Sequence, residues 1–176
     1  MTKRFQLLAA AVAVLALAAC GGESGTTDSG AAAPAADAGN ATLPNGVTVK
    51  QQIEVRQKSL KEMGAAMKTI GDQMKSGAPE LDQIRPAVQT IKTHSTELPT
   101  WFPAGTGPES GVKTEALAKI WEDQPGFQAA AQRLADEAAR LSDVATGEDL
   151  AAIGAQVAAT GGACKNCHDQ FRMKKE

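Results

Sequence analysis

The residues best suited to chemistry lie in the stretch GGACKNCHDQF, residues 161–171. It places two thiols, Cys164 and Cys167, and one imidazole, His168, within five consecutive residues. Three chemistries use such a cluster: a disulfide redox pair, a zinc site, and the covalent attachment of haem. The remainder of the chain has to distinguish among these three kinds of site.

Two of the three chemistries lack support elsewhere in the chain. A zinc site would need three or four protein ligands, and only His94 and carboxylates remain to complete one. A thioredoxin-like redox pair belongs beside a βαβ unit, and the sequence shows no strand pattern. Haem attachment needs only two thiols for the porphyrin vinyl groups and one imidazole for the iron. We therefore predict one haem c, attached through Cys164 and Cys167, with His168 as the iron ligand.

Four segments carry apolar residues at alternating spacings of three and four, which indicates four α-helices. They are predicted from Val47 to Lys75, from near Pro79 to Leu98, from about Pro125 to before Gly147, and from about Glu148 to the cysteine cluster. Pro86 lies inside the second segment and should kink that helix or delay its start. The long crossover between the second and third helices is expected to hold one short helix. This pattern predicts an all-α fold, an antiparallel four-helix bundle with covalently bound haem.

The apolar stripe of the first helix contains one charged residue, Arg56. The stripe consists of Val49, Ile53, Arg56, Leu60, Met63, Met67, Ile70 and Met74. A buried charge without a partner costs several kcal/mol, and no acidic residue lies on the matching stripes. A haem propionate is therefore a candidate partner for Arg56, and an arginine that reaches water at the bundle edge is the alternative. The methionines are interpreted as core-filling residues.

The N-terminus predicts export. Lys3 and Arg4 precede an apolar run that is too short for a membrane span, so residues 1–19 are interpreted as a signal peptide. The sequence LAAC at its end resembles a lipobox, which would make Cys20 a lipidated N-terminus; the alternative is an ordinary secretory signal with an incidental Cys20. Residues 20–45 are nearly all small and are predicted to form a flexible tether, followed by a domain over residues 46–176.

Charge excludes one class of partner. Without the two basic residues of the signal, 16 basic residues face 20 acidic ones, a net charge of −4. A mildly acidic protein lacks the basic surface that nucleic acid binding requires. Aromatic residues are only 3% of the chain, which is little for a core of this size, and a large apolar cofactor would supply the missing volume.

From about Val49 to Lys174 the sequence resembles the cytochrome c prime (cytochrome c') family, the high-spin class of c-type cytochromes. The matching stretches are VRQKSLKEM, LPTWFPAGTG, IWED and GACKNCHDQFRMKK. The resemblance implies an antiparallel homodimer of four-helix bundles with His168 as the proximal ligand. It also implies that Arg56 and Gln57 lie beside the haem propionates.

The same resemblance places Leu60 on the distal side of the haem, where low-spin relatives carry methionine. Because leucine has no lone pair to donate, a five-coordinate iron that binds NO or CO is expected. A six-coordinate cytochrome that shuttles one electron between envelope redox partners is the alternative. The sequence places no donor or base on the distal helix face near Leu60, so the protein is not expected to be an enzyme.

On the proximal side, Phe171 and Arg172 are implied neighbours of the haem. Arg172 is expected one helical turn beyond His168, and a solvated charge that favours the helix dipole is the alternative. The signal implies a periplasmic protein with a lipid anchor. Gly21 follows Cys20, and the absence of an acidic residue there favours the outer membrane over the inner one.

Overall fold

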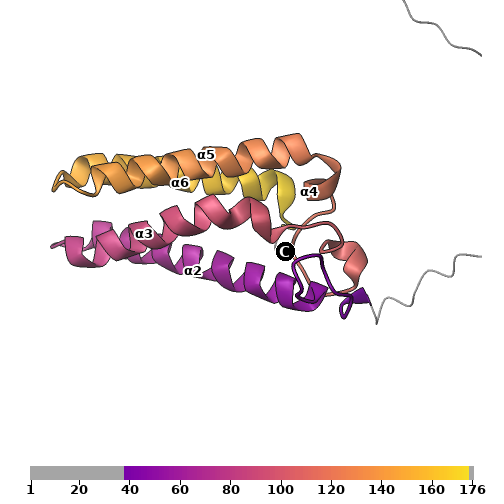
Figure 1. The fold of residues 1–176 in the computed structure, drawn as a ribbon. Helices are drawn as coiled ribbons and strands as arrows, with labels where there is room; N and C mark the ends of the chain where they lie inside the picture. Colours follow the sequence, from indigo (N-terminus) through magenta and orange to yellow (C-terminus); the bar gives the residue numbers. More distant parts are fainter. Residues whose placement is uncertain (1–37, 175–176) are drawn as a thin grey trace, which may run out of the picture. The chain divides into compact units, whose positions relative to one another are not determined.

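Four long helices dominate the computed structural model, in which residues 38–174 are described. They are α2 (Val49–Lys75), α3 (Leu81–Glu97), α5 (Gln124–Val144) and α6 (Leu150–Phe171). α2 packs on α3, α3 on α5, and α5 on α6, whereas α2 and α6 touch more sparsely. Consecutive long helices run in opposite directions (Figure 1). The predicted all-α antiparallel four-helix bundle is confirmed.

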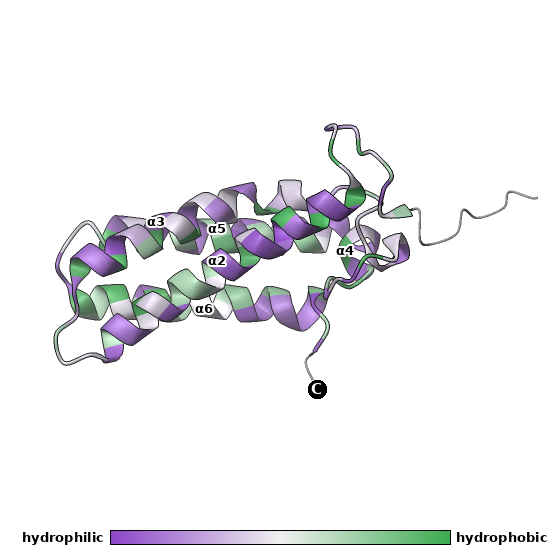
Figure 2. Ribbon diagram, turned by 90° about the horizontal axis from the view of Figure 1, so that it is seen from below, coloured by the Kyte–Doolittle hydropathy of each residue, from purple (hydrophilic) through white to green (hydrophobic). Residues whose placement is uncertain are grey.

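The crossover between α3 and α5 gathers at one end of the bundle. It contains the 3₁₀ helices η1 (Leu98–Trp101) and η2 (Pro108–Ser110) and the short helix α4 (Lys119–Glu122). The C-terminal end of α6 and the N-terminal end of α2 lie at this same end (Figures 1 and 2). We call it the crossover end.

Pro86 does not delay the second helix, which begins at Leu81 and runs through the proline. Its position explains this tolerance, because a proline in the second turn removes one backbone hydrogen bond near the start of the helix. Of the two expected effects of Pro86, the late start is therefore wrong, and the kink stays a prediction. The third helix carries its proline within the first turn, as predicted, and the side chain of Asp123 caps it by accepting from the Gly126 amide.

The residues before α2 fold back over its first turn, and we call residues 38–48 the N-terminal clasp. The amide of Val49 donates to the Ala41 carbonyl at 3.0 Å, and the amide of Lys50 donates to the Gly39 carbonyl at 2.9 Å. Amides in the first turn of a helix have no acceptor within the helix itself. The clasp therefore supplies acceptors that α2 lacks.

An apolar contact fixes the clasp in place. Leu43 is only 8% exposed and forms a small cluster with Val49 and Ile53 of α2. Val112 of the crossover packs against the same cluster. The tether predicted over residues 20–45 therefore ends before the clasp, because one large apolar side chain is enough to dock this segment.

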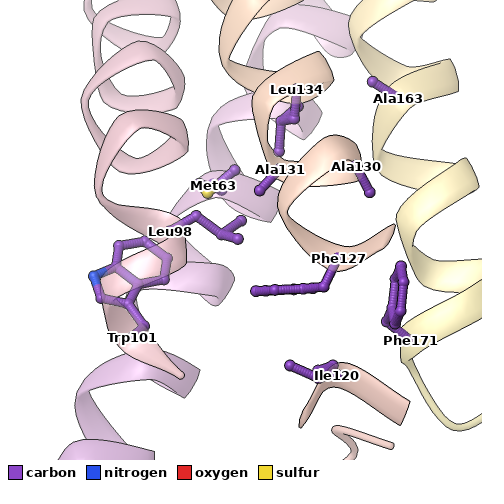
Figure 3. Close-up of a cluster of buried hydrophobic side chains, with 10 residues drawn as sticks. All are labelled: Met63, Leu98, Trp101, Ile120, Phe127, Ala130, Ala131, Leu134, Ala163 and Phe171. Atoms are coloured by element: carbon purple, nitrogen blue, oxygen red, sulfur yellow. The ribbon is translucent and has the colours of Figure 1, made fainter. Parts of the chain in front are cut away.

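Two apolar clusters divide the bundle along its length. The first lies at the crossover end and is drawn in Figure 3; its buried members are Met63, Leu98, Trp101, Ile120, Phe127, Ala130, Ala131, Leu134, Ala163 and Phe171. The second fills the other half of the bundle and includes Ile70, Ile84, Val88, Ile91, Leu141 and Ile153. The three aromatic residues among the first cluster's buried members come from η1, α5 and α6, so the crossover contributes directly to the core there.

The end of the bundle opposite the crossover depends on Arg85. Its Nε donates to the Ala145 carbonyl at 2.9 Å, and one Nη donates to the carbonyls of Thr146 and Gly147 at 3.3 Å. Carbonyls after the last turn of a helix have no intrahelical donor, and the positive charge also suits the negative end of the helix dipole. The guanidinium of α3 thus ties down the turn between α5 and α6.

We expect Arg85→Ala to lower the free energy of unfolding by about 1–2 kcal/mol, because charge-assisted hydrogen bonds to three carbonyls are lost. Urea denaturation followed by circular dichroism measures this. Lys68→Ala is the control: its ion pair with Asp72 is exposed, and losing it should cost less than about 0.5 kcal/mol. Equal unfolding midpoints for Arg85→Ala and the wild type would contradict the role of Arg85.

The export features fall outside the part of the chain that the structure describes. Residues 1–19 and Cys20 are among these. Within residues 38–174, no helix is both long enough and apolar enough to cross a membrane.

Candidate functional site

The two thiols lie near the C-terminal end of α6. Cys164 and Cys167 are both free and half-buried, and both pack against the first apolar cluster. Burial raises the pKa of Cys164. Burial, with a smaller contribution from Cys164, raises the pKa of Cys167 to about 11. The two thiols thus lie on the face of α6 that packs against this cluster. Because burial raises their pKa values, both thiols are protonated near neutral pH.

His168 lies in the last turn of α6, directly after Cys167, and is an exposed residue. Loss of part of its hydration lowers the pKa of the imidazole, and the positive charge of Arg172 lowers it further. The carboxylates of Asp169 and Glu115 act in the opposite direction. The net effect favours the neutral imidazole, which is the form that binds a metal.

A short strap holds the end of α6. The Leu117 amide donates to the Phe171 carbonyl at 3.0 Å, and the Met173 amide donates to the Glu115 carbonyl at 2.8 Å. Arg172 itself is extended, outside the helix, and its Nε donates to the Glu115 carboxylate at 2.7 Å. Pairing with the crossover ends α6 at Phe171, so Arg172 lies just outside the helix. Its amide still donates to the His168 carbonyl at 3.2 Å, so Arg172 follows His168 by one turn, as expected.

Phe171 is the last residue of α6 and is 2% exposed. Its ring meets Phe127 of α5 edge to face, with 5.5 Å between the ring centroids (Figure 3). The Nζ of Lys119 lies 5.6 Å from the Phe171 ring centroid. Phe171 therefore anchors the helix turn that carries His168 into the core.

Arg56 is 1% exposed, in agreement with its place on the apolar stripe. One Nη donates to the Thr106 hydroxyl at 3.2 Å, and the other donates to the Thr106 carbonyl and the Thr114 hydroxyl at 3.0 Å each. The guanidinium carbon lies 4.6 Å from the Phe102 ring centroid and 5.9 Å from that of Trp121. Neutral acceptors and two aromatic faces thus surround the charge.

The alternative that Arg56 reaches water at the bundle edge is wrong, because its side chain is enclosed. Among residues 38–174, none of the ion pairs involves Arg56. Burial lowers the pKa of Arg56 to about 10, although the more distant charge of Glu109 opposes this. A buried cation without a carboxylate partner fits an anion that the chain itself does not supply.

Gln57, the neighbour of Arg56, is half-buried and donates through Nε2 to the Lys113 carbonyl at 2.9 Å. The crossover therefore binds both polar residues of this helical turn. Sequence reasoning identified Arg56 and Gln57 but missed Thr106 and Thr114. Threonines in a crossover carry no periodic signal that could have identified them.

A ring of half-buried apolar residues surrounds the first cluster. Its members are Leu60, Phe102, Ala116, Trp121, Cys164 and Cys167. The structure thus brings the predicted residue Leu60 to the same cluster as the two thiols. Partly exposed apolar surface of this kind is typical of a site that a flat apolar ligand covers.

Met63, Met67 and His94 each have packing partners within the bundle. Met63 is 6% exposed within the first cluster, and Met67 packs against the second. His94 contacts the Glu62 carboxylate at 3.0 Å and the Trp101 ring edge to face. These contacts are consistent with core-filling methionines and a histidine that links α2 to the end of α3.

The residues present fit a haem in both chemistry and space. Two adjacent free thiols and one neutral imidazole provide its attachment points, and Arg56 faces no carboxylate of its own. Small residues precede the thiols on α6: Gly162 is exposed, and a Cβ at the half-buried Gly161 would meet only Met67 Cε at 3.8 Å. The sparse contact between α2 and α6 agrees with this open space.

Comparison with known proteins identifies the family. The family model described as Cytochrome C' matches residues 51–172. The chain belongs to the cytochrome c' family. Membership implies a covalently bound c-type haem, and the match covers all four long helices except the first residues of α2.

Curated members of the cytochrome c' family are similar over most of their length. The cytochrome c' of Pararhodospirillum photometricum is 37% identical over 121 residues, which cover 68% of this chain and 94% of the relative. That of Rhodopseudomonas palustris is 37% identical over 142 residues, which cover 78% and 94%. A solved nitric oxide complex of a leucine-to-isoleucine variant of Alcaligenes xylosoxidans cytochrome c prime has a TM-score of 0.64 at 28% identity, covering 72% and 97%.

Proposed function

We propose that this chain holds one haem c through thioether bonds at Cys164 and Cys167, with His168 as the iron ligand. The observation that carries this proposal is the convergence on one apolar cluster of two free thiols, Leu60 and the aromatic residues of the crossover. The chain contributes a helix that presents both thiols on one face, three residues apart. Phe171 holds the turn that carries His168.

The polar residues of α2 are proposed to bind the haem carboxylates. Arg56 is fixed by Thr106 and Thr114 but has no carboxylate partner among the described residues. Gln57 lies one residue further along the same turn, with its amide nitrogen fixed by Lys113. The two side chains are therefore oriented before any ligand arrives, which reduces the entropy cost of binding.

We propose a five-coordinate iron that binds NO or CO. When bound, the haem iron supplies a coordination position for a small uncharged ligand. Leu60 would cover that position without coordinating the iron, since its side chain has no lone pair and packs against the same apolar cluster as the thiols. The Alcaligenes xylosoxidans structure supports the proposal because it is a nitric oxide complex of a leucine variant.

The cellular setting is also part of the proposal. The N-terminal sequence supports export to the periplasm, with Cys20 as the lipid attachment point and the outer membrane as the membrane that holds it. Metabolic labelling with a radioactive fatty acid tests this, because Cys20→Ser should lose the label. The homodimer implied by the family resemblance stays a prediction.

The absorption spectrum of the purified ferrous protein tests the ligand-binding proposal. A high-spin spectrum without added ligand, with a new Soret maximum on addition of CO or NO, is the expected result. A low-spin six-coordinate spectrum without added ligand would contradict it and would favour the electron-shuttling alternative. An alkaline pyridine spectrum of the same sample reports separately whether the haem is covalently bound.

A further inference from the structure

The loop that holds Arg56 is itself held from the other side by the N-terminal clasp. Thr106 and Thr114 bind the guanidinium, and Val112 lies between them in the sequence. Val112 packs against the cluster of Leu43 and Ile53. The loop over residues 106–114 therefore lies between the clasp and Arg56.

The contact between clasp and loop is close. A Cβ built at Gly39 would lie 2.9 Å from Val112 Cγ2, so the clasp backbone approaches the valine with no room for a side chain. Ser110, which is 3% exposed, accepts the Val112 amide at 3.3 Å and donates to the Gly107 carbonyl at 2.6 Å. These bonds make the loop compact, so a displacement of Val112 would also move its neighbours.

The clasp lies before the region that the family match covers, which begins at residue 51. Its two roles can be separated: it caps α2 through backbone bonds to Val49 and Lys50, and it contacts the loop through Leu43.

We propose that the N-terminal clasp positions Arg56 by holding the loop over residues 106–114 against α2. Leu43 is the positioning residue, and it acts through Val112 on the threonines that bind the guanidinium. This proposal rests on the proposed function, in which Arg56 binds a haem carboxylate. The contacts that carry it are all between residues of the chain itself.

Hydrogen exchange measured by mass spectrometry on the purified full-length protein tests the proposal. Leu43→Ala is expected to speed exchange of the Ser110, Gly111 and Val112 amides about tenfold or more, because the loop opens locally. Leu43→Met, which keeps most of the apolar volume, should restore slow exchange. Arg85→Ala is the matched control, since it weakens the far end of the bundle and should leave loop exchange unchanged.

A double-mutant cycle then links the clasp to Arg56 itself. Arg56→Gln should speed loop exchange in the wild-type background and have a much smaller effect in the Leu43→Ala background, because the two residues hold the same loop. Additive effects would overturn the proposal. So would loop exchange within about twofold of the wild type in Leu43→Ala, because the clasp would then only cap α2.

The haem reduction potential gives a second readout that lost stability alone would not move. Leu43→Ala is expected to shift it in the same direction as Arg56→Gln, whereas Arg85→Ala should not. A shift in Arg56→Gln without one in Leu43→Ala would overturn the proposal. If the protein carries no haem, the proposed function fails, and the exchange measurements still decide whether the clasp holds the loop.

Discussion

Replacing both Cys164 and Cys167 with serine is expected to leave the chain with no covalently bound haem. A hydroxyl cannot form the thioether bond, and serine keeps the size of the side chain, so the helix should still fold. Each single variant keeps one attachment point and should retain some bound haem. Peroxidase staining of a denaturing gel measures this directly, because only covalently bound haem stays with the polypeptide.

Asn166→Ser is the matched control for the cysteine variants. Asn166 lies between the two cysteines on the exposed side of α6, where it accepts hydrogen bonds from Gln170. Haem staining equal to that of the wild type is expected for this variant. Staining that persists in the double serine variant would show that the thiols are not the attachment points.

Leu60→Ala is expected to raise the affinity of the ferrous protein for CO about 10- to 100-fold. Burying a leucine side chain is worth about 1.5–3 kcal/mol, and a ligand that displaces Leu60 must give up part of this energy. At 1.4 kcal/mol for each factor of ten, removing that cost accounts for the expected increase. Titration with CO, followed in the Soret band, measures the affinity.

Met74→Ala is the matched control, because Met74 lies about four turns further along α2 and packs against the second cluster. Its CO affinity should stay within about twofold of the wild type, since distant sites act independently. If Leu60→Ala binds CO as the wild type does, Leu60 does not control access to the iron. Increased affinity in both variants would instead indicate a general loosening of the bundle.

Helices and site residues could be predicted because both depend on local spacing. The alternation of three and four along α2 identified its stripe, and burial of Ile53, Arg56 and Ile70 agrees with it. The Cys-x-x-Cys-His spacing identified three candidate residues within one helix turn. Both signals come from residues that are close together in the sequence, so they can be recognised without knowing which helices pack against them.

Contacts between distant segments could not be predicted in the same way. The partners of Arg56 come from Thr106 and Thr114, which belong to irregular backbone with no periodic pattern. The bridge between Arg172 and Ala116 ends α6 through a similar long-range contact. Leu43, a single apolar residue among small ones, was too weak a signal to reveal that the chain folds back on α2.

The crossover end carries the thiols, His168 and Arg56, and both described ends of the chain leave the bundle there (Figure 1). A dye, tag or fused protein attached close to either described end would therefore sit beside the reactive face. The turn at residues 145–149 is tied down by Arg85, whereas Ser76, Gly77 and Ala78 at the same far end are exposed. Exposed turns with small residues tolerate insertion well. A probe inserted at Gly77 could be used to immobilise or label the protein, and the crossover end would stay open to solution.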